Sequence, residues 1–346
     1  METVTIARLA ASDLDAATAE DVYSWIDLSA CADARSVAAA ADRARRSHRI
    51  LIGVGRPAEG LKELIDAMSM SIHDGDVDDR RTVSVSSTAE ACNELSMAIR
   101  QNPMASMTCS QLLRMAEHLD VCGALVAESW AYSTLQSGPE FHRWLAADRP
   151  RKGSECTSSV LLNRTNDCLT IELDRPERHN AIDARMRDEL VNALDIALCD
   201  NTVDGVVLRG RGRSFSSGGD LAEFGTSPDP VTAHVIRVQH RPGEQIHRLA
   251  QRLGDRCVAD VHGAVVGGGL ELAAFAGHVV SDSQSLFRLP EVSMGLIPGA
   301  GGTVSVSRRI GRWRAAWLML TGNTIDAVTA ERWHLVDTVH TGSPSM

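Results

Sequence analysis

Three glycine-bearing segments of this 346-residue chain carry the groups that could do chemistry. They cover residues 214–224, 262–274 and 289–303. In the first segment, small residues stand between an expected strand and an expected helix. The N–H groups there could bind an anion or a polarised carbonyl oxygen, although a tight turn explains the same residues equally well.

Each of the other two segments holds one glutamate among apolar neighbours. Glu271 follows three consecutive glycines at the expected start of a helix, where a carboxylate can act in catalysis or simply complement the helix dipole. Glu291 follows an expected strand and a proline, and it could be catalytic or could pair with an arginine. The glycines at 299–302 lack the Lys-Ser/Thr pair of a phosphate loop, so no nucleotide-triphosphate site is expected.

Alternating strands and helices must position these segments. The patterns predict a helix after Asp183, which is a suitable N-cap, with Met186, Leu190, Leu194 and Ala197 on one face. Strands are expected at residues 160–162, 168–173, 205–208, 257–261 and 285–289. Such alternation is typical of an α/β domain. We therefore expect a catalytic domain over residues 158–346, after a polar linker at 151–157.

Residues 1–150 show mostly helical patterns and are expected to form a mainly helical N-terminal domain of unknown role. Helices are predicted at Ser36–Arg49 and Cys109–Trp130, with strands at Ile50–Val54 and Thr82–Val85. The acidic loop at 74–79 resembles the start of a calcium loop but lacks its closing glutamate. No metal site is expected there or elsewhere.

Composition narrows the classes of function. The 35 basic and 45 acidic side chains give a net charge of −10, which argues against a protein that coats nucleic acid or an anionic membrane. No apolar run is long enough for a membrane span, and the N-terminus lacks the pattern of a signal peptide. These features predict a cytoplasmic protein, in which the eight cysteines are reduced.

Together, the three segments resemble in order and spacing the enoyl-CoA hydratase/isomerase (crotonase) superfamily. The resemblance begins at Leu173-Asp-Arg-Pro-Glu-Arg-His-Asn-Ala-Ile182 and continues through residues 214–221, 263–272 and 290–303. It closes with Leu320-Thr-Gly322 and the segment 330–339. It implies a crotonase-like α/β fold, a spiral of β-β-α repeats, preceded here by the mainly helical N-terminal domain.

The resemblance also assigns roles to particular positions. It implies that the N–H groups of Gly219 and Gly268 form an oxyanion hole for the thioester carbonyl of an acyl-CoA. Backbone N–H groups around Ala181, Ser217 and Leu221 match those that hold the adenine of CoA in the superfamily. Arg178 is expected to meet a CoA phosphate.

The two glutamates suggest the subclass. Hydratases of the superfamily use two carboxylates at the positions of Glu271 and Glu291, one to activate water and one to protonate the α-carbon. The resemblance therefore implies reversible syn hydration of a trans-2-enoyl-CoA, with CoA present only as part of the substrate and no other cofactor. The alternatives are another crotonase reaction, such as isomerisation, thioester hydrolysis or cofactor-free oxygenation, and a retired acyl-CoA-binding scaffold.

One departure concerns the ends of the match. Superfamily members typically continue beyond the position of Asp337 with helices that cover the acyl pocket and build a trimer. Here the additional residues precede the match instead. We therefore expect the N-terminal part to cover the pocket, and we expect a homo-oligomer, either a trimer or a dimer of trimers.

Overall fold

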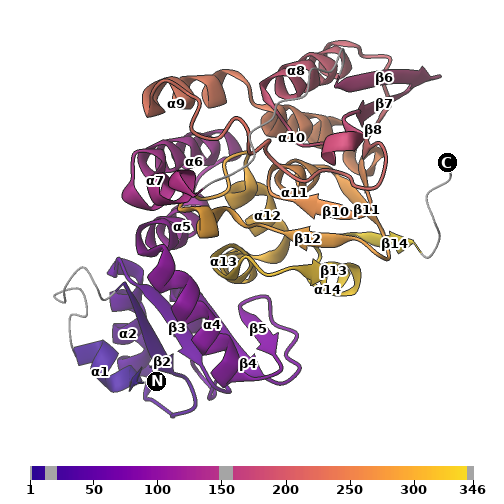
Figure 1. The fold of residues 1–346 in the computed structure, drawn as a ribbon. Helices are drawn as coiled ribbons and strands as arrows, with labels where there is room; N and C mark the ends of the chain where they lie inside the picture. Colours follow the sequence, from indigo (N-terminus) through magenta and orange to yellow (C-terminus); the bar gives the residue numbers. More distant parts are fainter. Residues whose placement is uncertain (1, 12–21, 148–158, 341–346) are drawn as a thin grey trace.

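The computed structural model describes residues 2–11, 22–147 and 159–340 (Figure 1). The predicted linker at 151–157 lies outside these residues. Figure 1 shows a smaller N-terminal sheet with its helices, and a larger body that contains the second half of the chain. Helices α5 to α7 lie between them and against the larger body.

The N-terminal part contains more strand than expected. Its sheet is parallel and follows chain order: β1 (Thr3–Val4), β2 (Tyr23–Asp27), β3 (Ile50–Val54), β4 (Met70–Asp74) and β5 (Thr82–Val85). The predicted strands at Ile50–Val54 and Thr82–Val85 are confirmed, whereas β1, β2 and β4 were not foreseen. Helices still supply most of the described residues in this part.

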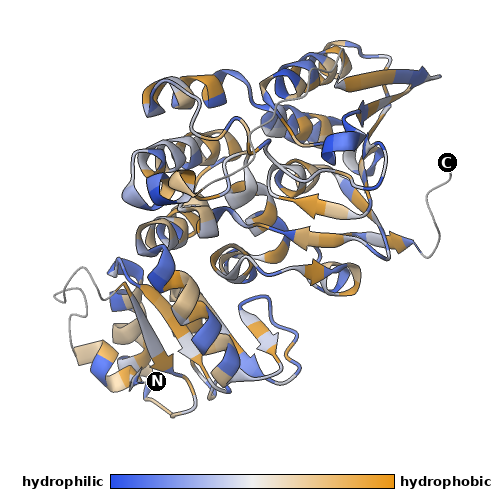
Figure 2. Cartoon of the chain, viewed as in Figure 1, coloured by the Kyte–Doolittle hydropathy of each residue, from blue (hydrophilic) through white to orange (hydrophobic). Residues whose placement is uncertain are grey.

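Helices cover both faces of this sheet. The central strand β3 is accordingly wholly buried, and it is hydrophobic over most of its length (Figure 2). One face packs with three helices: α1 (Ile6–Ala11), α2 (Ala34–Arg46) and α3 (Lys62–Ala67). The other face packs with α4 (Thr88–Gln101) and α5 (Pro103–Ala116). Strands covered on both faces are typical of parallel sheets.

The helix predicted over Cys109–Trp130 is wrong as a single element. The chain instead forms α5 and then α6 (Val121–Gln136), followed by α7 (Pro139–Ala146). The break occurs because Asp120 adopts an extended backbone and its carboxylate accepts the Gly123 N–H at 2.7 Å. An aspartate in this position starts a new helix rather than continuing the old one.

The larger body is built on two sheets. The six-stranded sheet has the order β14-β11-β9-β8-β7-β6, and only β6 runs antiparallel to its neighbour. Its strands are β6 (Val160–Thr165), β7 (Cys168–Leu173), β8 (Gly205–Gly210), β9 (Cys257–Val261), β11 (His278–Asp282) and β14 (Thr338–His340). The second sheet contains β10 (Ala264–Val266), β12 (Leu286–Arg288) and β13 (Ile325–Asp326).

Helices cover these sheets and carry the candidate residues. They are α8 (Ala184–Cys199), α9 (Pro230–Gln239), α10 (Pro242–Leu253), α11 (Gly268–Ala273), α12 (Gly302–Ile310), α13 (Arg312–Thr321) and α14 (Ala327–Arg332). Asp183 caps α8 as predicted, and the four apolar residues expected on one face of that helix are buried. The strand predictions in this half are confirmed, with shifts of up to three residues at the ends.

The largest apolar core runs through both parts of the chain. Helix α13 packs against α4, α5, β4 and β5. Trp313 Nε1 donates to the Ile65 carbonyl at 3.2 Å, and Arg312 Nη1 donates to the Met68 carbonyl at 2.6 Å. The N-terminal part therefore shares its core with the larger body. Among the described residues, none of the helices combines the length and apolarity needed to cross a membrane.

Candidate active site

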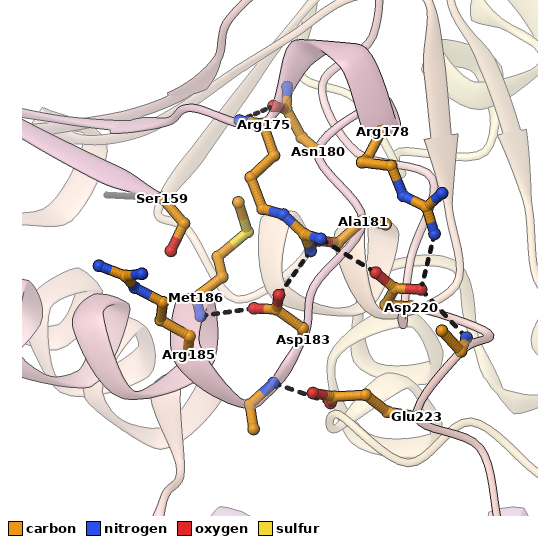
Figure 3. Close-up of polar contacts among 12 residues, drawn as sticks. Ser159, Arg175, Arg178, Asn180, Ala181, Asp183, Arg185, Met186, Asp220 and Glu223 are labelled. Atoms are coloured by element: carbon orange, nitrogen blue, oxygen red, sulfur yellow. Dashed lines mark hydrogen bonds and ion pairs between the residues drawn. The ribbon is translucent and has the colours of Figure 1, made fainter. Parts of the chain in front are cut away.

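A buried ion-pair network shapes the segment 174–183 and joins it to the loop that contains Gly219 (Figure 3). Arg175, only 1% exposed, donates to the Ala181 carbonyl at 2.6 Å. Its guanidinium also lies 2.9 Å from a carboxylate oxygen of Asp183 and 3.1 Å from one of Asp220. Arg178 pairs with the other oxygen of Asp220 at 3.2 Å. This network holds the two loops together.

We expect Arg175→Met to destabilise the protein strongly, because it leaves Asp183 without its ion-pair partner and the buried Asp220 with Arg178 alone. Breaking a buried ion pair in this way costs about 3–5 kcal/mol of unfolding free energy. Arg211→Met is the control, since the pair of Arg211 with Asp174 is more exposed and contributes about 0–1 kcal/mol. Urea unfolding followed by circular dichroism gives both values. Equal losses in the two variants would contradict the importance of the network.

Gly219 and Gly268 lie close together, as the oxyanion-hole prediction requires. Ile182 forms a β-bridge with Gly219, which places the Gly219 nitrogen 3.8 Å from where a Cβ on Gly268 would stand. No described residue accepts a hydrogen bond from either N–H. Gly218 allows this approach, because it has φ +88° and a Cβ there would lie 2.9 Å from the Val266 carbonyl oxygen. Two free donors therefore converge on one place.

Strand pairing brings the two predicted glutamates to the same edge. Strands β10 and β12 run parallel with Val266 opposite Arg288, so the residues after their ends meet. Glu271 lies on α11, directly after β10, whereas Glu291 begins the short 3₁₀ helix Glu291–Met294 after β12. Both side chains are buried.

The two carboxylates have different environments. Glu271 Oε2 accepts the N–H groups of Ala300 at 2.6 Å and Gly302 at 2.7 Å. Glu291 Oε1 packs against Gly267, where a Cβ would lie 2.5 Å from it and where φ is +50°. Glu291 Oε2 is buried and has no hydrogen-bond partner among the described residues. An unpartnered buried carboxyl oxygen is rare outside functional sites.

Helix α6 supplies a third buried carboxylate, which the sequence analysis missed. Glu128 Oε1 accepts the Gly301 N–H at 2.7 Å, and Oε2 accepts the Thr303 N–H at 3.0 Å and the Thr303 hydroxyl at 2.5 Å. Four successive N–H groups, from Ala300 to Thr303, thus alternate between Glu271 and Glu128. The signal in the sequence was a lone acidic residue in an otherwise uncharged helix.

Burial alters the proton affinity of all three glutamates. It raises the pKa of Glu128 to about 8, with a further contribution from the nearby charge of Glu271. Burial raises the pKa of Glu271 to about 7, against the effect of the backbone N–H groups that favour its charged form. The pKa of Glu291 is raised well above its ordinary value by burial and then by the charge of Glu271. Glu271 and Glu128 therefore exchange protons near neutral pH, and Glu291 favours its protonated form.

These shifts imply that the protein loses stability as the pH rises. The native carboxyls hold protons that unfolded glutamates have already released, so their contribution is complete below the pKa of an unfolded glutamate and is lost as the pH rises through the native values of about 7 and about 8. Unfolding free energies measured by urea denaturation should fall from acidic to mildly alkaline pH. Glu128→Gln should flatten that dependence, and an unchanged pH profile in this variant would contradict the assignment.

The free N–H groups and the two predicted glutamates face one cavity of about 480 Å³, which we call the glutamate cavity. Its lining includes Gly219, Gly268, Glu271 and Glu291, and it also includes Tyr132 from α6. A smaller cavity of about 190 Å³ shares Gly219 and Gly268 and adds Glu128. The N-terminal part of the chain therefore contributes walls to both cavities.

The residues predicted to hold CoA differ in their hydrogen bonding and exposure. The N–H of Ala181 donates to the Arg178 carbonyl at 3.0 Å, and that of Ser217 donates to the His179 carbonyl at 2.9 Å. The first of these bonds closes the turn at 178–181, and the second joins the loop at 216–219 to the segment that contains His179. Leu221 is 46% exposed beside this segment, and Arg178 is partly exposed. Roles in CoA binding at these positions stay predictions.

Among the described residues, no group of three or more histidine, cysteine, aspartate or glutamate side chains is arranged to hold a metal ion. The charges of Glu128, Glu271 and Glu291 influence one another, but these side chains do not form such a cluster. Their partners are backbone N–H groups and the cavity, which is an arrangement suited to proton transfer.

Comparison with known proteins matches residues 163–343 to the family described as enoyl-CoA hydratase/isomerase. The chain is 32% identical to the 2,3-dehydroadipyl-CoA hydratase of Escherichia coli K12, over 53% of this chain and 69% of that protein. It is also 32% identical to a probable mitochondrial enoyl-CoA hydratase of Dictyostelium discoideum, over 53% of this chain and 64% of that protein. It is 32% identical to a trans-2-decenoyl-[acyl-carrier-protein] isomerase of Streptococcus mutans, over 51% and 67% respectively.

A solved structure of a putative enoyl-CoA hydratase from Rhodopseudomonas palustris CGA009 aligns with a TM-score of 0.49 and 30% identity, over 55% of this chain and 72% of that one. The family match covers more than half of the chain and includes Gly219, Gly268 and both predicted glutamates. The chain belongs to the enoyl-CoA hydratase/isomerase family, the crotonase superfamily.

Proposed function

We propose that the protein is an enoyl-CoA hydratase, which adds water reversibly and syn to a trans-2-enoyl-CoA. The observation that carries this proposal is the pair of buried carboxylates, Glu271 and Glu291, in one cavity with two free N–H groups. An isomerase or a scaffold has less need of two such groups. Curated relatives that match the chain include hydratases, which supports the same conclusion.

The reaction begins with the thioester carbonyl. Its oxygen accepts hydrogen bonds from Gly219 N–H and Gly268 N–H, which draws electrons from the conjugated double bond. When a nucleophile attacks the β-carbon, negative charge moves onto this oxygen as the enolate forms. One preorganised donor of this kind is worth about 3–4 kcal/mol of transition-state stabilisation.

The carboxylates handle the proton transfers. Glu271, held at Oε2 by two backbone N–H groups, uses its other oxygen to take a proton from water as the water oxygen bonds to the β-carbon. Glu291 enters the reaction protonated, as its raised pKa favours, and gives its proton to the α-carbon as the enolate collapses. Glu271 is then protonated and Glu291 ionised, and transfer of one proton from Glu271 to Glu291, directly or through solvent, restores the pair.

CoA takes part only as the carrier of the acyl group, and the chemistry uses no other cofactor. We place its adenine near Ala181, Ser217 and Leu221, and one of its phosphates near Arg178. We also propose a homo-oligomer, a trimer or a dimer of trimers. Light scattering of the purified protein measures that state directly.

Turnover assays test the proposed reaction. Crotonyl-CoA and trans-2-hexenoyl-CoA are incubated with the protein, and loss of the conjugated-thioester absorbance is followed while the products are identified by mass spectrometry. We expect 3-hydroxyacyl-CoA from at least one substrate. Release of free CoA, a shifted double bond, or bound but unchanged ester would contradict the hydratase assignment in favour of a hydrolase, an isomerase or a scaffold respectively.

A further inference from the structure

One cation in the glutamate cavity has only neutral partners. Arg237, on α9, lines both cavities described above. Its guanidinium lies 4.4 Å from the centre of the Tyr132 ring. Its hydrogen bonds go to Ser129, Ser133 and Gln136 on α6, and those to Ser129 Oγ and Gln136 Oε1 are long, at 3.3 and 3.4 Å. The bond to Ser133 Oγ is short, but all these acceptors are neutral, and neutral oxygens compensate a buried charge less well than a carboxylate does.

The other arginines that line these cavities differ in this respect. Arg187 pairs with Asp188 at 2.7 Å, and Arg241 pairs with Glu244 at 3.1 Å. Within the described parts of the chain, no carboxylate lies within 4.0 Å of the Arg237 guanidinium. Burial lowers the pKa of Arg237, and the smaller opposing effects of Tyr132 and of the charge of Glu128 do not cancel it. The cavity thus presents one positive charge without a carboxylate in contact with it.

The position of this charge relates it to the acyl group. The glutamate cavity contains the two carboxylates that act on the α- and β-carbons, and Arg237 lines the same cavity together with Tyr132 and Gln136. An acyl chain that starts at the oxyanion glycines and fills this cavity has Arg237 among its walls. A guanidinium in a partly desolvated site binds a carboxylate much more strongly than it binds an alkyl group.

We propose that the acyl group of the preferred substrate ends in a carboxylate that pairs with Arg237, so that the protein prefers enoyl-CoA thioesters of dicarboxylic acids over those of monocarboxylic acids. This inference rests on the proposed function for the identity of the CoA ester. It adds the chemical class of the acyl group, which the two glutamates and the oxyanion glycines do not distinguish.

Binding of saturated esters tests this inference without turnover. Titration calorimetry compares glutaryl-, adipyl- and suberyl-CoA with pentanoyl-, hexanoyl- and octanoyl-CoA, which match them in length. We expect at least one dicarboxylic ester to bind about 100-fold more tightly than its partner, the value of a charge-assisted pair in a partly buried site. No preference at any of the three lengths would overturn the inference.

Variants identify the residue responsible. Arg237→Gln should remove the preference and leave the affinity for the monocarboxylic esters within about threefold, whereas Arg237→Lys should keep part of it. Arg248→Gln, on the exposed side of α10, is the matched control and should bind as wild type does. Equal weakening of both ester classes in Arg237→Gln would show a merely structural role and would also overturn the inference. Thermal melting checks that each variant is folded.

The two proposals fail in different ways. Preferential binding of a dicarboxylic ester without any hydration of its 2-enoyl form would contradict the hydratase and leave the inference about Arg237 standing. Rapid hydration of trans-2-hexenoyl-CoA, with no binding preference at any length, would support the hydratase and refute the inference.

Discussion

Replacing Glu291 by glutamine should lower kcat for enoyl-CoA hydration by about 10³-fold, the usual loss when a general acid is removed. Glutamine keeps the size of the side chain but has no proton to give to the α-carbon. Because Glu291 Oε2 has no partner among the described residues, the substitution breaks no hydrogen bond of the folded protein at that atom. The protein should therefore remain folded and should still bind a saturated acyl-CoA.

The same reasoning applies to Glu271→Gln, with one difference. Its Oε2 accepts two backbone N–H groups, so a glutamine can preserve the loop only if its carbonyl oxygen takes that place. Glu331→Gln, an exposed substitution on α14, is the control for both variants. Initial rates and calorimetric affinities separate chemistry from binding. A Glu291→Gln enzyme with a kcat within threefold of wild type would refute its role as the acid.

Replacing Glu128 by alanine should reduce kcat by about 10- to 100-fold and also destabilise the protein by a few kcal/mol, roughly 1–3 for each buried donor left without an acceptor. The N–H groups of Gly301 and Thr303 would lose their acceptor. The same turn holds Glu271 through Ala300 and Gly302, so a shift of the turn would displace the catalytic oxygen. Glu128 is in this sense a positioning residue from the N-terminal part of the chain.

A pH profile distinguishes this role from a general loss of stability. Burial and the charges of Glu271 and Glu128 raise the pKa of Glu291. Without Glu128, Glu291 should lose its proton more readily, so the alkaline limb of the kcat/KM profile should move to lower pH. Glu128→Gln, which is also uncharged but similar in size, should show the same shift with a smaller loss of stability.

Glu140 provides a matched control for Glu128. It is also buried and accepts two backbone N–H groups, those of Met104 at 2.8 Å and Ala105 at 2.9 Å. These contacts lie at the start of α5, away from the residues that line the glutamate cavity. Glu140→Gln should therefore lower stability while leaving kcat and its pH profile nearly unchanged. Similar pH shifts in both variants would contradict a specific role for Glu128.

The second half of the chain could be predicted from local patterns because Gly268, Glu271 and Glu291 each follow closely on the end of a strand. Gly268 and Glu271 come directly after β10, and Glu291 comes after β12. Parallel pairing of these two strands then brings the groups together, and no information from distant parts of the chain is needed. The N-cap at Asp183 could also be predicted from the sequence, since capping depends on a few neighbouring residues.

The N-terminal part was harder because its structure depends on distant contacts. Strand β1 has only two residues, too few to show a pattern, and β2 mixes polar with apolar residues where β3 is a continuous apolar run. The role of Glu128 depends on a contact across 173 residues of sequence with Gly301. Likewise, the Ser217 N–H donates to the His179 carbonyl, which lies in a loop distant in the sequence.

Hydration of crotonyl-CoA in deuterium oxide tests the central claim most directly, because it asks whether this site adds water and delivers a proton to the α-carbon. Nuclear magnetic resonance of the product, with wild type and Glu291→Gln compared in parallel, identifies where the deuterium lies. We expect wild type to form 3-hydroxybutyryl-CoA with a single deuterium at the α-carbon, and the variant to form almost none. Unchanged crotonyl-CoA, deuterium at the γ-carbon, or equal product from both proteins would contradict the account.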